Sequence, residues 1–382
     1  MPIDRRLFSH FDWPLFGLAL LIPLSGLLVL YSAGYDPDKT ISVISWMSLE
    51  LHSEDFAKQL LFIGISLIAL ILALAIPPSV VQKYAYLFYI VCMVLLLLVA
   101  EFGIVVNGSR RWLSLGRVNL QASEVVKLGI IFAFARFLSR HPPPREGYGF
   151  ISLLFPSFLL LLPMGLIMLQ PDLGSAIVVG SVGACMLLFM GVRLRVLIPL
   201  VVIAVFAIIP AYSYVLHDYQ KRRIEVLFNP DADPKGSGYH ITQSKIAVGS
   251  GKLLGKGFLN GTQTQLQFLP EHTTDFVFSV LAEEWGFVGC ISVLMLYMLL
   301  LTRLLQLAQR TRDLFSCLLI FGVASRIFCN VVINVSMVVG LLPVVGIPLP
   351  LFSYGGSSIV SLMFSIGIVL GIGMRRFAYM RS

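Results

Sequence analysis

Several charged side chains occur in stretches that are otherwise apolar, and these residues could carry chemistry. Glu124 and Lys127 are three positions apart, which places both on one face of a helix. Asp172 follows a proline at the start of an apolar segment, and Arg326 lies inside another. An ionisable side chain is costly in lipid, so each is a candidate functional residue. For Glu124 and Lys127 the alternative is a structural ion pair, and Arg326 is more readily explained as a packing residue.

Asp275 stands near the end of Leu269-Pro-Glu-His-Thr-Thr-Asp-Phe276, which leads into an apolar run. Beside Phe276 and Phe278 an aspartate is partly desolvated, and it is then a better proton acceptor than a fully solvated one. Such a group could remove the proton of an attacking hydroxyl. The alternative is that Thr274 or Asp275 caps the first turn of the following helix. Spacing alone favours the cap.

Two basic segments lie between apolar runs. In the shorter one, three arginines surround Trp112, namely Arg110, Arg111 and Arg117. The longer one, 215–274, contains the run Tyr219-Gln-Lys-Arg-Arg223. This run fits either a helix on the membrane surface, with its cations near lipid phosphates, or a solvated basic face. Because functional residues are often placed on loops, both segments are candidates for a site.

The stretch Gly249–Gly257 superficially resembles a phosphate-binding loop. That loop needs four residues between its glycines and a Ser or Thr after the lysine, and neither Lys252 nor Lys256 is followed by one. A nucleotide-driven pump is therefore disfavoured. A flexible glycine hinge that presents lysines to an anionic head group stays open.

The cysteines and histidines predict neither a disulfide nor a metal site. All 5 cysteines fall in apolar runs without a CxxC pair, and the 6 histidines show no ligand spacing. A buried cysteine usually behaves as a small hydrophobic residue.

The composition identifies the environment that must position these residues. Of 382 residues, 57% are hydrophobic and 13% charged, and the mean hydropathy is +0.88. A soluble domain has roughly 25% charged residues. The chain is therefore predicted to be a polytopic membrane protein. Its net charge of +8 is explained by cytoplasmic loops rich in Lys and Arg, and it does not predict nucleic-acid binding.

Ten apolar segments are long enough, or nearly so, to cross about 30 Å of hydrocarbon, and lipid requires them to be helices. They are 13–33, 57–76, 84–106, 121–140, 149–169, 172–191, 194–214, 275–302, 314–340 and 356–374. The predicted fold is an all-α membrane protein of ten transmembrane helices, one domain over 1–382. A large extracytoplasmic loop, 215–274, separates helices seven and eight. Lys and Arg in the short loops predict that both termini are cytoplasmic.

Four blocks, in this order and spacing, resemble the SEDS family (shape, elongation, division and sporulation). They are Arg111-Trp112 followed by Ser-Glu-Val-Val-Lys127, Gln170-Pro-Asp-Leu-Gly174, the Pro-Glu-His-Thr-Thr-Asp-Phe276 entrance, and Gly340–Ser358. The segments Tyr239–Gly251 and Gly257–Leu266 resemble the elongation branch, which maintains rod shape. The chain departs from the family pattern where His272 and Thr273 stand in the opposite order, and where Ala122 replaces a common proline.

This resemblance implies a peptidoglycan glycosyltransferase in the bacterial cytoplasmic (inner) membrane, with its active site outside. It would polymerise lipid II into β-1,4 glycan strands by inverting displacement of undecaprenyl pyrophosphate. Asp275 matches the family's essential aspartate and is the expected base. The expected substrate-binding residues are Arg111, Trp112, Ser123, Glu124, Lys127, Asp172, Gln243, Lys245 and Glu271. Arg111, Lys127 and Lys245 are candidates to stabilise the departing pyrophosphate.

Cofactors, partners and other functions are less constrained by the sequence. No cofactor follows from it, and assistance by Mg²⁺ or Mn²⁺ is left open. The implied partners are lipid II, the nascent glycan strand, a class B penicillin-binding protein with transpeptidase activity, and other elongation-complex membrane proteins. A lipid II flippase is the alternative function, disfavoured because the unusual polar residues are mostly external. A scaffold that only recruits a transpeptidase would leave Asp275 unexplained.

Overall fold

The computed structural model describes most of the chain. It covers residues 10–35, 41–42, 50–51, 53–106, 109–114, 119–210, 212–213, 218–229, 233, 236–266, 268–269 and 271–375. Arg117 and parts of the predicted external loop lie outside these residues. The chain divides into two compact units, and each contains segments far apart in sequence. One unit comprises Met1–Ala75, Arg223–Arg303 and Asn330–Leu370, and the other comprises Ile76–Arg222, Leu304–Cys329 and Gly371–Ser382.

Each of the ten predicted apolar segments falls on a helix. The helices are α2 (Trp13–Ala33), α3 (Glu54–Ala75), α4 (Pro78–Phe102), α5 (Ala122–Arg140), α6 (Phe150–Leu169), α7 (Leu173–Met190), α8 (Leu194–Pro210), α12 (Val277–Arg310), α13 (Leu314–Val338) and α14 (Gly356–Arg375). Among the described residues, 8 helices are long and apolar enough to cross a membrane. The other two are α5, which carries several charges, and the shorter α8. A membrane-spanning helical protein is confirmed, whereas ten spans stay a prediction.

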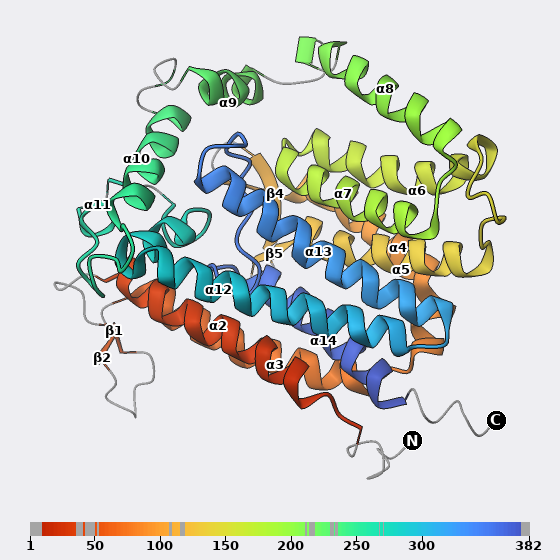
Figure 1. The fold of residues 1–382 in the computed structure, drawn as a ribbon, viewed down its shortest axis with the longest axis horizontal. Helices are drawn as coiled ribbons and strands as arrows, with labels where there is room; N and C mark the ends of the chain where they lie inside the picture. The colour runs from red at the N-terminus through yellow and green to blue at the C-terminus, as the bar shows by residue number, and fades with distance from the viewer. Residues whose placement is uncertain are drawn as a thin grey trace. The chain divides into compact units, whose positions relative to one another are not determined.

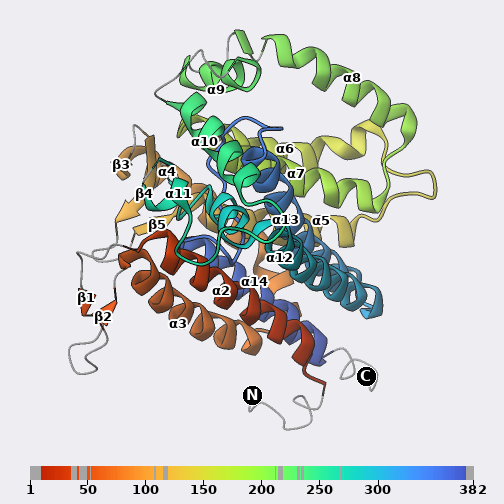
Figure 2. The same ribbon diagram turned by 60° about the vertical axis from the view of Figure 1, so that its left-hand side comes forward.

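In the first unit, α2 and α3 lie side by side, as Figures 1 and 2 both show. The loop between α13 and α14 is fixed against both helices. Gln59 on α3 accepts from the Gly355 N–H at 3.2 Å and donates to the Ser353 carbonyl at 3.2 Å. Gly26 on α2 lies directly against the Phe352 carbonyl, where a Cβ would collide. Small residues at such contacts let backbones approach closely.

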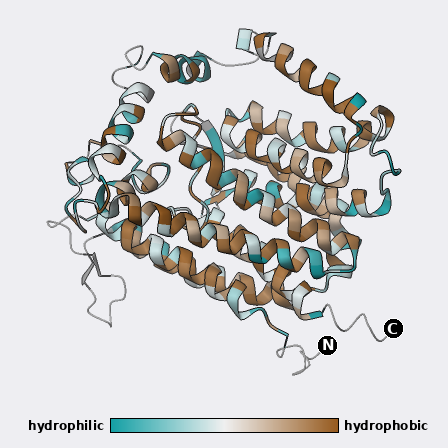
Figure 3. Cartoon of the chain, viewed as in Figure 1, coloured by the Kyte–Doolittle hydropathy of each residue, from teal (hydrophilic) through white to brown (hydrophobic). Residues whose placement is uncertain are grey.

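In the second unit, α5 packs against α4, α6 and α7. Nearly every side chain of α5 is buried, although α6 exposes a broad apolar face that includes Ile151 and Phe158. Figure 3 shows how strongly apolar α6 and α7 are. An apolar exposed surface of this extent fits contact with lipid. Three strands, β3 (Ile104–Val106), β4 (Ser109–Ser114) and β5 (Asn119–Gln121), form an antiparallel sheet that leads into α5.

The predicted external loop contains short helices. They are α9 (Asp218–Phe228), α10 (Ser237–Ser250) and α11 (Thr262–Gln265). The basic run forms part of α9, and Arg223 donates to the Val344 carbonyl at 2.9 Å. Two short strands, β1 (Ile41–Ser42) and β2 (Glu50–Leu51), pair between α2 and α3.

Helix α12 is interrupted at Gly286, which has φ 63° and ψ −160°. The turn Lys252–Gly257 supplies backbone partners at this break. Phe287 N–H donates to the Lys252 carbonyl at 2.9 Å and Val288 N–H to the Leu253 carbonyl at 3.1 Å. In the other direction, the N–H groups of Lys256 and Gly257 each donate at 2.9 Å, to the carbonyls of Glu283 and Glu284. The turn is therefore bonded into the helix, and contact of its lysines with an anionic head group stays a prediction.

The break predicts that Gly286→Ala destabilises the protein. Alanine disfavours a positive φ, and its Cβ would collide with Gly255 N and the Leu253 carbonyl. The expected loss is about 1–3 kcal/mol in the free energy of unfolding. It is detected as a lower Tm in detergent. Gly64→Ala is the matched control, since nothing lies within 4 Å of its Cβ position. Equal Tm values for both variants would show that the break imposes no constraint.

Candidate functional site

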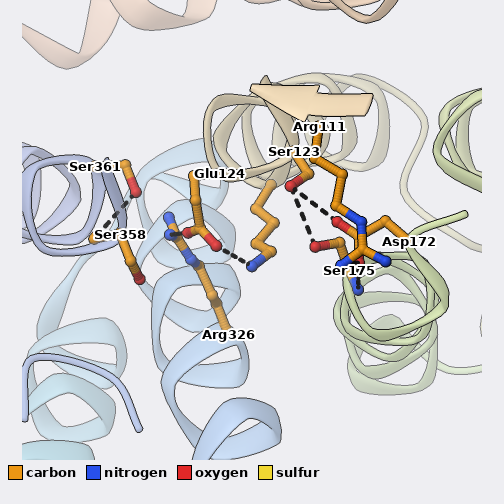
Figure 4. A network of polar contacts seen from close by, with 9 residues as sticks. Arg111, Ser123, Glu124, Asp172, Ser175, Arg326, Ser358 and Ser361 are labelled. Atoms are coloured by element: carbon orange, nitrogen blue, oxygen red, sulfur yellow. Dashed lines mark hydrogen bonds and ion pairs between the residues drawn. The ribbon is translucent and has the colours of Figure 1, made fainter. Parts of the chain in front are cut away.

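Three buried charges from two helices form a continuous ion-pair cluster. Glu124 and Lys127 lie on α5 and Arg326 on α13, and Figure 4 shows the side chains of Glu124 and Arg326 pointing toward one another. Glu124 Oε1 is 2.6 Å from Lys127 Nζ, and Glu124 Oε2 is 2.7 Å from Arg326 NH2. All three residues are at most 3% exposed. One carboxylate is thus shared by two cations in a medium of low dielectric constant, where such contacts are strong.

The sequence predicted the Glu124–Lys127 pair but missed its third member. The sequence leaves Arg326 a candidate functional residue and favours packing, whereas the structure shows that it donates a charge-assisted hydrogen bond to Glu124. A signal was available, because an arginine inside an apolar span needs a counter-ion. Few carboxylates are candidates for that role, and Glu124 is one of them. The pairing joins α5 to α13, although 202 positions separate the residues in sequence.

A second polar network lies where β4 meets the start of α7. Asp172 caps α7 by accepting from the Ser175 N–H at 3.1 Å. Ser123 donates to Asp172 Oδ2 at 3.5 Å and accepts from the Ser175 hydroxyl at 3.1 Å. Arg111 lies 3.8 Å from Asp172 Oδ1 (Figure 4), and it also donates to the Pro171 carbonyl. Arg111 therefore already has protein partners.

Trp112 is the neighbour of Arg111 on β4. It pairs with Ile104 of β3 and with Gln121 of β5, and its side chain is half-buried. The register of β4 against β3 shifts between the Arg110 and Trp112 pairs, so Arg111 stands at a bulge, where regular strand alternation is interrupted. The predicted Arg111–Trp112 pair belongs to the strand that leads toward α5.

In the other unit, Asp275 lies in a tightly wound turn before α12. The N–H groups of Thr274, Asp275 and Phe276 all donate to the Glu271 carbonyl, at 3.2, 3.1 and 3.2 Å. Glu271 itself has φ 52°, a strained value. The Phe276 carbonyl accepts from Ser279 N–H at 2.9 Å and begins the helix. Phe276, rather than Thr274 or Asp275, occupies the N-cap position.

The Asp275 turn is held against the α13–α14 loop by hydrogen bonds. Asn334, which is fully buried, donates to the Asp275 carbonyl at 2.9 Å and to the Ile347 carbonyl at 2.7 Å. The Tyr354 N–H donates to the Thr273 carbonyl at 3.0 Å. A Cβ on Gly346 would lie 3.4 Å from Asp275 Oδ2. The backbone of the turn is therefore fixed on two sides.

Helix α10 brings further predicted residues to this unit. Buried Ser244 bonds the Ser279 hydroxyl at 2.8 Å and the Val338 carbonyl at 2.7 Å. Lys245, next to it, is exposed, and its side chain lies against Gly340. Gln243 is half-buried, and Glu271 is exposed and accepts from the Thr274 hydroxyl at 3.1 Å.

His240, also on α10, has its ring 6.1 Å from that of Phe276. Burial lowers the pKa of His240 below its usual value and is the largest effect. The nearby Arg223 also lowers this pKa, whereas Glu271 and Asp233 raise it. Burial therefore favours the neutral form of the imidazole.

The predicted site residues thus form two groups, one in each unit. Glu124 and Lys127 join Arg326, and Arg111 and Ser123 join Asp172; these belong to the second unit. The first unit holds Asp275, Glu271, Gln243 and Lys245. Among the residues that the structure describes, no group of three His, Cys, Asp or Glu side chains could hold a metal ion.

These features define a polytopic helical membrane protein with ionised side chains inside its helical units. The family model described as "Cell cycle protein", which covers FtsW, RodA and SpoVE, matches residues 12–377. The chain belongs to this family.

Relatives cover most of the chain. Peptidoglycan glycosyltransferase MrdB of Escherichia coli K12 is 45% identical over 317 residues, which are 82% of this chain and 84% of that protein. A solved structure described as "Structural coordination of polymerization and crosslinking by a peptidoglycan synthase complex" has a TM-score of 0.80 and 32% identity, covering 96% and 98%. The rod shape determining protein RodA of Thermus thermophilus has a TM-score of 0.69 and 30% identity, with the same coverage.

The shared carboxylate predicts an asymmetric response to substitution. Glu124→Gln leaves Lys127 and Arg326 buried without the anion that they share, which costs about 3–5 kcal/mol of stability. The matched control is the triple variant Glu124→Leu, Lys127→Met, Arg326→Met, which has no buried charge and regains most of that loss. Thermal unfolding in detergent measures both. A single variant as stable as the unmodified protein would contradict the ion-pair interpretation.

Proposed function

We propose that the chain is a peptidoglycan glycosyltransferase of the elongation type, which polymerises lipid II into β-1,4 glycan strands. The observation that carries this is family membership over residues 12–377, together with 45% identity to a relative named peptidoglycan glycosyltransferase. The relatives' names favour polymerisation over the flippase alternative. The active site lies on the extracytoplasmic side of the cytoplasmic membrane and both termini lie inside, as the distribution of basic residues predicts.

Asp275 is the proposed general base. Its carboxylate removes the proton of the acceptor hydroxyl as that oxygen attacks the anomeric carbon of the donor. Displacement from the opposite face inverts this carbon and releases undecaprenyl pyrophosphate. The bonds to the Asp275 and Thr273 carbonyls support this role, because they fix the backbone of the turn that carries the carboxylate. A fixed base lowers the entropic cost of reaching the reactive geometry.

The cations have different proposed roles. Lys245 is exposed and lies in the same unit as Asp275, so it is the proposed partner of the leaving pyrophosphate. Lys127 and Arg111 already pair with Glu124 and Asp172. These pairs support a positioning role within their own unit, with Ser123 joining them.

Three further residues are proposed to contact the substrate directly. They are Trp112, through its half-buried ring, and Gln243 and Glu271, through their polar groups. A divalent cation is left open as an aid at the pyrophosphate.

Asp275→Asn tests the base directly. The amide has the same shape but cannot accept the proton at neutral pH, so polymerisation of labelled lipid II into glycan ladders is expected to stop. Lipid II binding and Tm are expected to be unchanged. The control is Asp218→Asn, which changes an exposed aspartate of α9 and keeps full activity. Normal ladders from Asp275→Asn would remove the assignment.

The proposed partner is a class B penicillin-binding protein that cross-links the new strand. The similarity to a chain from a complex that coordinates polymerisation and crosslinking supports this. The long loop that carries α9, α10 and α11 is the proposed contact, because it leads into the Asp275 turn. Other elongation-complex membrane proteins are expected partners by the same family reasoning.

The chain is reconstituted with and without a transpeptidase whose own catalytic serine is replaced. The polymerisation rate is expected to be several-fold higher when this partner is present. Ordering of the loop by the partner would increase the population of the active geometry. The control is an unrelated single-span membrane protein at the same density. A rate that the transpeptidase does not change, with no co-purification in detergent, would indicate a self-sufficient polymerase.

A further inference from the structure

The turn Lys252–Gly257 exposes two large apolar side chains beside an exposed apolar part of α12. Leu253 is 67% exposed and Leu254 79%. Phe287 and Val288, whose N–H groups donate to carbonyls of the turn, are 58% and 52% exposed. Trp285 is 43% exposed. We call these five residues the leucine patch. Exposing so much apolar area to water is unfavourable. Large exposed apolar patches usually mark an interaction surface.

The position of the leucine patch along α12 indicates what covers it. From Trp285 to Thr302 the helix has no Asp, Glu, Lys or Arg. At about 1.5 Å per residue, this stretch is roughly 27 Å long, close to the roughly 30 Å thickness of the hydrocarbon core. The part of α12 before it contains Glu283 and Glu284, both buried within the protein. The patch therefore lies at one end of the apolar stretch.

The opposite end of this stretch has the features of a membrane boundary. Arg303 pairs with Asp12 at 3.1 Å, and the adjacent Trp13 is 64% exposed. Tryptophan is enriched at membrane–water interfaces, where its amphipathic ring is favoured. Trp13 and Trp285 thus mark two boundaries, and the turn reaches α12 at the second one.

The exposed face of α12 continues from the leucine patch toward Arg303. Ile291, Met295 and Met298 are 42%, 54% and 58% exposed, and their helical spacing places them on the same side as Phe287 and Val288. Leu253 and Leu254 lie in the turn rather than in α12, and they extend this apolar face beyond the helix. Four backbone hydrogen bonds fix them there.

We propose that the turn Lys252–Gly257 is a lipid anchor, with Leu253 and Leu254 inserted at the hydrocarbon edge of the outer leaflet. Exposed Lys252 meets the phosphates of phospholipid head groups, a pairing typical of lysines at membrane interfaces. Lys256 does not take part, because its ammonium lies 2.6 Å from Glu283 Oε1. This inference does not depend on the proposed enzymatic function.

An anchor at this place constrains the loop that carries predicted site residues. Helix α10 ends at Ser250, directly before the turn, and bears Gln243 and Lys245. Insertion of the leucines thus holds this helix near the boundary at which a lipid-linked sugar has its pyrophosphate. A protein partner covering the same patch is the competing interpretation.

Spin labelling in liposomes measures the depth of the turn. The label is attached to Leu254→Cys in a chain whose 5 native cysteines are replaced by alanine. Relaxation by oxygen, which concentrates in lipid, is expected to exceed relaxation by a water-soluble nickel chelate several-fold. Glu225→Cys is the matched control. It is an exposed residue of α9, the helix bonded to the α13–α14 loop through Arg223, and there the ratio is expected to reverse.

Either of two other results would overturn the lipid anchor. Strong relaxation of the Leu254 label by the nickel chelate would place the turn in water. Weak relaxation by both reagents would show that protein covers it.

A second measurement retains the native cysteines. A photo-reactive benzoylphenylalanine at position 254 is expected to form adducts with phospholipid in native membranes, identified by mass spectrometry. Adducts formed only with protein would overturn the proposal.

Discussion

The shared carboxylate of Glu124 is the interaction on which the second unit depends. Two cations from two helices meet one anion among buried side chains. Removing any one of these charges leaves the others in an apolar environment, so the three residues act as a unit. Packing of the surrounding apolar side chains is non-directional. The charges therefore define the register of α5 against α13 more specifically than the apolar contacts can.

The same constraint governs the backbone. A helix interrupted inside an apolar region exposes N–H and C=O groups that lipid cannot satisfy. At Gly286 the chain meets this requirement with the Lys252–Gly257 turn, whose carbonyls and N–H groups complete those of α12. At the α13–α14 loop, the side-chain amides of Gln59 and Asn334 donate to backbone carbonyls and satisfy them in the same way. Irregular backbone at these positions is thus a defined structure rather than a flexible segment.

The sequence predicted some of these features for identifiable physical reasons. Hydropathy placed helices in all ten apolar segments because lipid leaves the backbone few alternatives. The Glu124–Lys127 pair followed from helical spacing alone. The partner of Arg326 was not predicted, because Glu124 is 202 positions away in sequence and no local pattern records a tertiary contact. The α12 break was missed because a glycine in an apolar helix is common, and only its φ of 63° distinguishes it. Lys245, Gln243 and Glu271 came from family resemblance, and their contacts with substrate stay predictions.

The distribution of satisfied groups separates structural charges from those available for chemistry. Lys127 and Glu124 form a short, buried ion pair, and the partly exposed Arg111 contacts Asp172 and the Pro171 carbonyl. Using them on a substrate would require breaking these contacts. Lys245, by contrast, is exposed on a helix that Ser244 anchors. The hydrogen bonds that fix the Asp275 turn involve its backbone carbonyls and amides. A chain that binds a charged substrate at a membrane surface needs both kinds of residue. Buried pairs make the scaffold rigid, and exposed groups held by backbone contacts can exchange water for the substrate at lower cost.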